Sequence, residues 1–217
     1  MSRVLPILFN TEMVRAILDD RKTVTRRICK DGDDYSVPDM SFYDADKRTY
    51  AVHSYVNKEH TEKLSLAERT CPICPGDILY VRETWCKLGE YHYMADYGTD
   101  RDNIFFEAIS DSKWRPSIHM PKEAARIWLK VHDVRVERLH EMRLDDFLKE
   151  GVVIREESFN DPENAHQQAR AAFKDIWDST VKKSALDIYG WNANPYTWAI
   201  EFERCEKPEV ENAKEVK

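Results

Sequence analysis

The chain has 217 residues, with 33 Lys and Arg against 40 Asp and Glu, so its formal net charge is −7. Its 42% hydrophobic and 11% aromatic residues are enough to form a core, which excludes a disordered chain. The acidic total also opposes a protein that coats long duplex nucleic acid, although it allows one that holds a single nucleotide in a pocket.

The N-terminal residues predict a strand followed by a helix. The apolar run at 3–9 is typical of a short buried strand, and Pro6 places it at an edge or a bend. Asn10 is a good N-cap for a helix over 11–19, whose apolar residues fall on one face. Residues 23–25 are β-branched and therefore favour extended structure.

The middle of the chain is less regular. Residues 31–70 are polar, with a weak helical stretch near 58–69, and we interpret them as an insertion and not as a second domain. A compact strand is expected at 78–81. Residues 90–114 predict a hairpin with a polar turn at 98–103.

The C-terminal part carries the clearest periodicity. Alternating apolar residues predict a long strand at 127–136, with a bulge near His132, and a final strand at 196–202. A short helix is expected at 144–148, and the best helical pattern covers 162–182.

These elements combine into an α+β fold, which we expect to be a small β-barrel flanked by helices. We predict a single domain over 1–206, with an insertion at about 31–70 and a hairpin at about 88–113. Residues 207–217 are charged and predict a flexible tail.

The sequence argues against a membrane or exported protein. The apolar run at 4–9 is too short to span a bilayer, and polar residues follow it at once, unlike in a signal peptide. Five cysteines without a framework spacing are typical of reduced thiols, so we expect a cytoplasmic location. Cys71 and Cys74 have the spacing of a zinc knuckle, but a structural zinc site needs four ligands, so turn or core thiols are favoured. We expect no cofactor.

The charges are distributed unevenly. Residues 1–30 carry a net charge of +4 and residues 114–138 carry +3, so the remainder of the chain is strongly acidic. If these two segments meet in the fold, they form a local cationic site on an acidic body. The alternative, that both are solvated surface, stays open.

Two groups of side chains could carry chemistry. Lys22 and Thr25 lie in a seven-residue run that is rich in hydroxyls and guanidiniums. In a regular strand they would point to opposite faces, so they converge only if Lys22 precedes the strand or a bulge intervenes. Glu83 lies at a strand end beside Trp85, where it could act as a general acid or base next to a stacking platform.

Two further motifs offer polar contacts. Residues 114–121 hold polar side chains in a loop that prolines stiffen, and residues 191–195 form a second turn in which a Trp and an Asn are possible contacts. The candidate substrate-binding residues are Arg21, Arg26, Trp85, Arg115, Ser117, His119, Arg126, Trp191 and Asn194.

Four blocks in this order resemble the ASCH-domain family, a branch of the PUA-like superfamily of RNA-associated small barrels. The blocks run from Pro6 to Arg27, from Pro75 to Trp85, from Trp114 to Pro121 and from Tyr189 to Pro195. The set is most similar to the longer ASCH proteins of phages and prophages, which would place the protein in the cytoplasm of a bacterial host.

The resemblance implies a β-barrel with a cleft between barrel and helices. Some small bacterial members are amidohydrolases that remove acetate from 4-acetylcytidine, using a Lys, a Thr three residues later and a Glu on a later strand. Lys22, Thr25 and Glu83 match this set. Other members are ribonucleases, and many have no assigned activity. A modified nucleoside or single-stranded RNA is therefore the expected partner.

Several alternatives stay open at this point. Lys22 acts as the base if its pKa is lowered, whereas Glu83 is the base if Lys22 stays charged and stabilises an oxyanion. The two could instead form an ordinary ion pair. The protein could also be a non-catalytic reader of RNA or of a modified base, or a phage accessory protein with an unknown protein partner.

Overall fold

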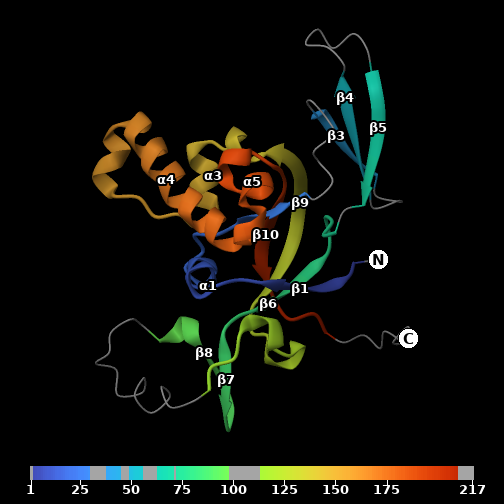
Figure 1. Ribbon diagram of the computed structural model, residues 1–217. Helices are drawn as coiled ribbons and strands as arrows, with labels where there is room; N and C mark the ends of the chain where they lie inside the picture. The colour runs from blue at the N-terminus through green and yellow to red at the C-terminus, as the bar shows by residue number, and fades with distance from the viewer. Residues whose placement is uncertain are drawn as a thin grey trace. The chain divides into compact units, whose positions relative to one another are not determined.

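The computed structural model describes residues 2–29, 38–44, 49–55, 63–70, 72–97 and 113–209. Five strands form one sheet in the order β1-β6-β9-β10-β2 (Figure 1). Their bounds are β1 Val4–Leu8, β2 Val24–Ile28, β6 Ile78–Arg82, β9 Trp128–Arg138 and β10 Tyr196–Cys205. β1 and β6 are parallel, whereas β6 with β9 and β10 with β2 are antiparallel.

The sheet and its helices make a mixed α/β protein. Within the described ranges this sheet has two edge strands, β1 and β2, and no closed barrel is found. The mixed composition that we predicted is therefore present, whereas the small barrel is not seen. The chain divides into two compact units, one of residues 1–18, 76–130 and 203–217, and one of residues 19–75 and 131–202.

The first unit contains β1, the helix α1 (Thr11–Leu18), β6 and a hairpin of β7 (Trp85–Leu88) and β8 (Glu90–Tyr93). Asn10 caps α1 as predicted, because its side chain accepts a hydrogen bond from the Met13 amide at 2.9 Å. Of the hairpin predicted at 90–114, residues 90–93 form a strand that pairs with 85–88, and residues 98–112, with its turn and second arm, lie outside the described part. Two short 3₁₀ turns follow, at Ser117–His119 and Lys122–Ala124.

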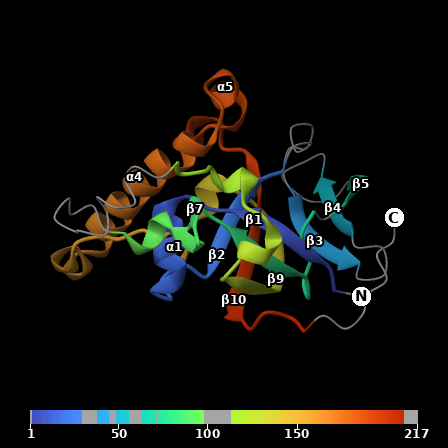
Figure 2. The same ribbon diagram turned by 90° about the horizontal axis from the view of Figure 1, so that it is seen from below.

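The second unit contains β2, most of β10, the later part of β9 and three helices, whose apolar cluster includes Ile28 of β2. The helices are α3 (Leu144–Lys149), α4 (Pro162–Thr180) and α5 (Leu186–Tyr189). Asp161 caps α4 by accepting hydrogen bonds from two amides of its first turn, and Pro162 occupies the first position. The apolar face that we predicted for this helix is buried, and Figure 2 shows β2 running alongside β10 in the same unit.

Three described ranges within the segment 31–70 form strands, one of them where we expected a weak helix. β3 (Pro38–Asp44), β4 (Thr49–Tyr55) and β5 (Lys63–Thr70) make a three-stranded antiparallel sheet. The helix expected near 58–69 is therefore wrong for residues 63–69. Lys63–Thr70 pairs with β4 along its length, so sheet hydrogen bonding prevails over a weak local preference.

Among the described residues, no helix combines the length and apolar composition needed to cross a bilayer.

Candidate functional site

The residues that we selected from the sequence fall into two groups, one in each unit. The first unit holds Glu83, Trp85, Arg115, Ser117, His119 and Arg126. The second unit holds Arg21, Lys22, Thr25, Arg26, Trp191 and Asn194. Each group is built from segments far apart in the sequence, so each is described in its own unit.

Glu83 is the buried centre of the first group. Its side chain is 1% exposed and accepts two hydrogen bonds from Arg126, with Nε to Oε1 at 2.9 Å and Nη2 to Oε2 at 3.1 Å. The Arg126 Nη1 also contacts both carboxylate oxygens of Asp96 at 2.8 Å, and the guanidinium lies 4.0 Å from the centre of the Tyr93 ring. Arg126 is therefore held by two carboxylates and an aromatic face, and its orientation is fixed.

The pKa of Glu83 is raised, and the main cause is burial, which disfavours the charged carboxylate. The hydrogen bonds and the charge of Arg126 act in the opposite direction without reversing the shift. A buried carboxyl group with a raised pKa beside aromatic rings has the character of a general acid or base.

The loop 114–121 is docked onto β6 and β7. Trp85 and Arg115 exchange two backbone hydrogen bonds, at 3.2 and 2.8 Å. Arg82 donates from Nε to the Met120 carbonyl at 2.8 Å and from Nη2 to the Ile118 carbonyl. Two of the four blocks that carry the family resemblance are thus in direct contact, because the Arg-Glu-Thr-Trp end of one strand holds the Trp-Arg-Pro loop.

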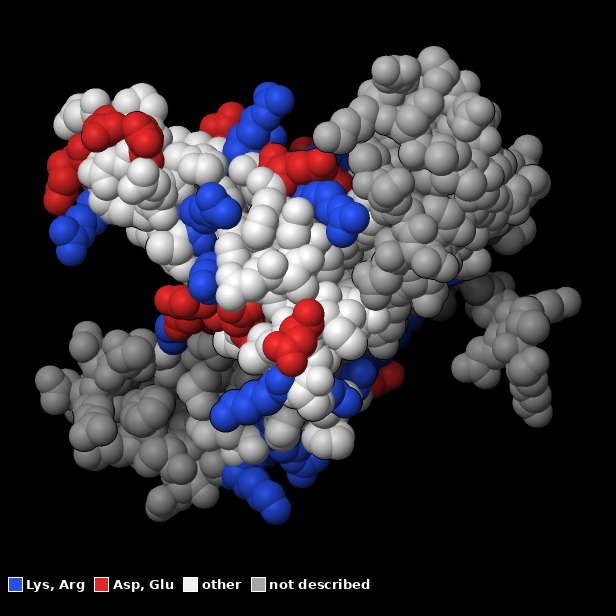
Figure 3. Space-filling view, turned by 45° about the horizontal axis from the view of Figure 1, so that its top comes forward, with Lys and Arg blue, Asp and Glu red and all other residues white. Residues whose placement is uncertain are grey.

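Cations cover the aromatic rings of this unit. The pairs, with distances from the charged group to the ring centre, are Lys87 over Tyr91 (5.1 Å), Arg115 over Trp85 (5.2 Å), Lys122 over Tyr80 (5.9 Å), Arg126 over Tyr93 (4.0 Å) and Lys207 over Trp128 (5.9 Å). All five rings belong to one apolar cluster. We call these ten residues the cation–aromatic cluster. In Figure 3, Lys and Arg side chains gather among uncharged ones in the lower part of the view.

Lys22 is the buried centre of the second group. Its side chain is fully buried, and Nζ lies 2.8 Å from the Val24 carbonyl, 3.0 Å from the Glu150 carbonyl and 2.5 Å from the Glu150 Oε2. An ammonium group has three N–H bonds, and these three oxygens match them in number. The Glu150 side chain, which is 3% exposed, also accepts a hydrogen bond from Arg26 at 3.3 Å.

The pKa of Lys22 is lowered, chiefly because burial disfavours the charged amine, while the Glu150 carboxylate opposes the shift. The cations Arg27 and Arg26 add smaller lowering effects. Of the candidate residues selected from the sequence, Arg26 is among these causes, whereas Arg21 and Glu83 are not. Arg21 instead bonds to Asp19 and to the Gly151 carbonyl, and Glu150 is the carboxylate that opposes burial.

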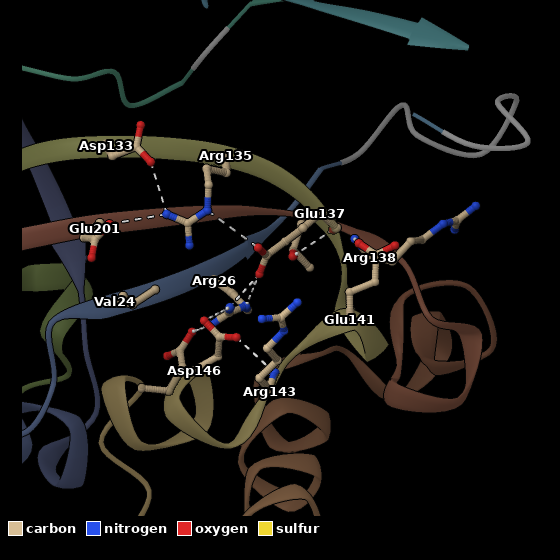
Figure 4. A network of polar contacts seen from close by, with 12 residues as sticks. Val24, Arg26, Asp133, Arg135, Glu137, Arg138, Glu141, Arg143, Asp146 and Glu201 are labelled. Carbon is tan, nitrogen blue, oxygen red and sulfur yellow. Dashed lines mark hydrogen bonds and ion pairs between the residues drawn. The ribbon is translucent and has the colours of Figure 1, made fainter. Parts of the chain in front are cut away.

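Arg26 extends this group into a network. Its side chain is fully buried and contacts carboxylates of Glu137 and Asp146, at 2.5 and 3.3 Å from Nη2. Figure 4 shows Arg135 on the far side of Glu137, in contact with Asp133 and Glu201. The cations that we expected to line a cleft are therefore largely neutralised by carboxylates within their own unit.

Thr25, Trp191 and Asn194 have roles that packing accounts for. Thr25 is 1% exposed and pairs with Ile200 in the sheet, next to the Lys22 segment. Trp191 is 4% exposed and packs against Phe147, Phe173 and His140.

Asn194 adopts a left-handed conformation with φ of 50°, which Asn tolerates better than most residues. Its side-chain oxygen accepts a hydrogen bond from the His140 amide at 2.8 Å. The fourth block of the resemblance therefore shapes a turn and fills a core.

Ser117 and His119 lie in the docked loop, with Ser117 half-buried and His119 exposed. For the zinc knuckle, Cys71 lies outside the described residues and Cys74 is a buried thiol. Within the described ranges, no group of three or more His, Cys, Asp or Glu side chains is arranged to hold a metal ion.

The comparisons with known proteins give no relative. No protein-family model matches the chain, and neither a curated protein nor a solved structure is significantly similar to it.

Sequence reasoning missed Glu150, Asp96 and Arg82. Glu150 sits 128 residues from Lys22, and no local pattern connects two positions so far apart. Arg82 had a usable signal, because it directly precedes the Glu-Thr-Trp motif that we did select.

Proposed function

We propose that the protein binds a short single strand of nucleic acid, RNA in the first instance, through the cation–aromatic cluster of its first unit. The observation that carries the proposal is the set of five cations, each placed over a ring of one apolar cluster. Proteins that bind single strands combine cations for the backbone with aromatic rings for the bases. The order of the four sequence blocks supports membership of the ASCH family as part of the same proposal.

Each half of the cluster has a part in such binding. Lys87, Arg115, Lys122 and Lys207 are exposed and can contact phosphates. Trp85 and Trp128 are buried, whereas Tyr80, Tyr91 and Tyr93 are half-buried and can contact a base.

The local charge favours the same ligand. Residues 113–130 contain five Lys and Arg and a single Glu, on a chain whose net charge is −7. An acidic body repels bulk nucleic acid, so a strand is held where the cations are concentrated. This arrangement suits a short contact better than a long one.

A fluorescent RNA of about 12 nucleotides, titrated in an anisotropy assay, tests the proposal. The double variant Arg115→Gln/Lys122→Gln should weaken binding about tenfold or more and flatten the dependence of log Kd on log salt by about 0.7 for each phosphate that is no longer neutralised. The matched control is Lys182→Gln/Lys183→Gln, which removes two exposed cations of the second unit. Equal weakening by both pairs, or no binding by the wild type, would contradict it.

A second candidate is hydrolysis of the amide of an acylated nucleoside such as 4-acetylcytidine. It is favoured by the lowered pKa of Lys22, which lies three residues from Thr25 and has the character of an activated amine. The reaction would add water across the amide bond and release a free base amine and a carboxylic acid. The resemblance also implies a role for Glu83, which belongs to the other unit.

Mass spectrometry of a panel of acylated nucleosides tests this candidate. Lys22→Met keeps the length of the side chain and removes the amine, so it should abolish turnover. Because it also leaves the buried Glu150 carboxylate without that partner, its turnover is measured at a temperature at which circular dichroism shows it to be folded. Absence of turnover by the wild type on the whole panel, or full turnover by Lys22→Met, would remove the candidate and leave the binding proposal standing.

A further inference from the structure

Ile118 is an apolar side chain that the first unit exposes at the centre of a basic loop. It is 59% exposed, although Met120, two residues later, is 1% exposed and buried in the apolar cluster. The exposed residues near it in the sequence include the cations Arg115 and Lys122, together with His119 and one carboxylate, Glu123. A single exposed Ile is common on protein surfaces, so its significance depends on how its backbone is held.

The backbone of Ile118 is fixed from several sides. Arg82 donates to its carbonyl and to that of Met120. The 3₁₀ turn adds hydrogen bonds from the His119 amide to the Pro116 carbonyl and from the Met120 amide to the Ser117 carbonyl, both at 3.0 Å. The loop therefore presents the Ile118 side chain to solvent on a rigid support, and little conformational entropy is lost when it meets a ligand.

We infer that Ile118 is a wedge that inserts between two neighbouring bases of the strand held by the cation–aromatic cluster. This inference rests on the proposed function and adds to it how that strand is held. Proteins that distort nucleic acid insert apolar side chains, Ile among them, between base steps and separate the stacked bases. Arg115 precedes Ile118 in the sequence and Lys122 follows it, and both are exposed, so they can contact phosphates next to the opened step.

The wedge predicts a ligand with stacked purines that can be opened at one step. Separation of two bases costs a few kcal/mol, which the flanking phosphate contacts offset. Cations alone would hold a strand without disturbing its stacking. Binding with a wedge and binding by cations alone therefore differ in whether the bases of the bound strand stay stacked, and not only in affinity.

Single-stranded oligonucleotides of about 12 residues, each with one 2-aminopurine at a different central position, distinguish the two. The fluorescence of 2-aminopurine rises when its stacking is broken, so binding by the wild type should raise the emission several-fold for at least one position. Ile118→Ala should lose this rise while its Kd, measured by anisotropy on the same strands, changes less than about tenfold. Ile188→Ala is the matched control, because Ile188 is 51% exposed and lies in the second unit.

The outcomes separate the wedge from the proposed function. Binding by the wild type without any rise in emission, or an undiminished rise in Ile118→Ala, overturns the wedge and leaves nucleic-acid binding in place. Absence of binding by the wild type overturns both. Alternatively, Ile118 binds in an apolar pocket of a protein partner. In that case the wild type should bind the strand without any rise in emission.

Discussion

The ammonium nitrogen of Lys22 and a carboxylate oxygen of Glu150 lie 2.5 Å apart, although 128 positions separate the residues in the chain. The two residues also form an isolated β-bridge, and the Thr23 amide bonds to the Lys149 carbonyl at 2.9 Å. The start of β2 is therefore tied to the end of α3 by backbone and side chain together. The side chains of Lys22 and Glu150 are both shielded from water, so removal of one partner of this ion pair is costly.

We expect Glu150→Ala to lower the free energy of unfolding by about 3–5 kcal/mol, because it leaves the Lys22 ammonium buried without its carboxylate. Lys22→Met/Glu150→Ala removes both charges and should destabilise less than the sum of the single variants Lys22→Met and Glu150→Ala. Urea unfolding of the four proteins measures these values. A loss below about 1 kcal/mol in Glu150→Ala would be typical of an exposed pair and would contradict the burial described above.

Glu83 should make stability depend on pH. Its pKa is raised in the folded protein, so between its ordinary and its raised pKa the folded state binds more protons than the unfolded state. The free energy of unfolding therefore falls as the pH rises through that window. Glu83→Gln cannot titrate, so the stability of the wild type relative to this variant should decrease as the pH rises above the ordinary pKa of a Glu, about 4.3.

Urea unfolding of wild type and Glu83→Gln at several pH values provides the test. An increase of the wild-type stability relative to Glu83→Gln over the same range would mean that Arg126 outweighs burial and that the pKa of Glu83 is lowered.

Arg82 should act on ligand binding through the loop that it holds. Arg82→Met removes the hydrogen bonds to the Ile118 and Met120 carbonyls while Arg115 and Lys122 stay in place. We expect about tenfold weaker oligonucleotide binding, since the loop must then be ordered by the ligand. Hydrogen exchange of the His119 and Met120 amides should quicken in the same variant.

The conservative change Arg82→Lys offers a control for charge. It keeps the cation but cannot hold two carbonyls with the same planar fork, so its affinity should lie between those of wild type and Arg82→Met. Wild-type affinity in Arg82→Met, together with unchanged exchange, would show that the loop holds its shape by other contacts.

Gly190→Ala should destabilise the second unit. A Cβ at this position would lie 2.5 Å from the Leu186 carbonyl oxygen, a backbone atom that has to move. We expect a loss of about 1–3 kcal/mol and a lower Tm in thermal unfolding. Gly89→Asn is the comparison, because nothing lies within 4 Å of its Cβ position and Asn tolerates its positive φ. If Gly190→Ala has the same Tm as the wild type, the backbone of α5 moves away from the added Cβ without a loss of stability.

Local patterns were sufficient to predict most elements of the two units. The strands at 3–9, 78–81 and 196–202 and the helix at 162–182 follow from apolar spacing and from capping residues, which act over a few positions. Residues 63–70 form a strand instead, because the hydrogen bonds that fix it come from β4, and the segment's own residues do not indicate that pairing.

Local sequence patterns did not predict which side chains pair with the ionisable residues. The sequence identified Lys22, Arg26 and Arg126 as cations worth attention, and all three are partly or fully buried. It did not indicate Glu150 or Asp96, because a pairing over tens of residues depends on the path of the whole chain. The expected cationic cleft therefore became two groups of neutralised cations and one exposed basic loop.

The division of the chain has a consequence for how this protein folds during synthesis. The chain passes between the two units four times, at residues 18, 75, 130 and 202, so neither unit is a continuous fragment. β10, which lies between β9 and β2 in the sheet, contains residues 196–205 and is translated after all its neighbours. While the nascent chain still lacks β10, β9 and β2 each have an unpaired edge, which is a site for aggregation. We therefore expect the sheet to be completed only late in synthesis, and fragments cut at any of the four crossings to be insoluble.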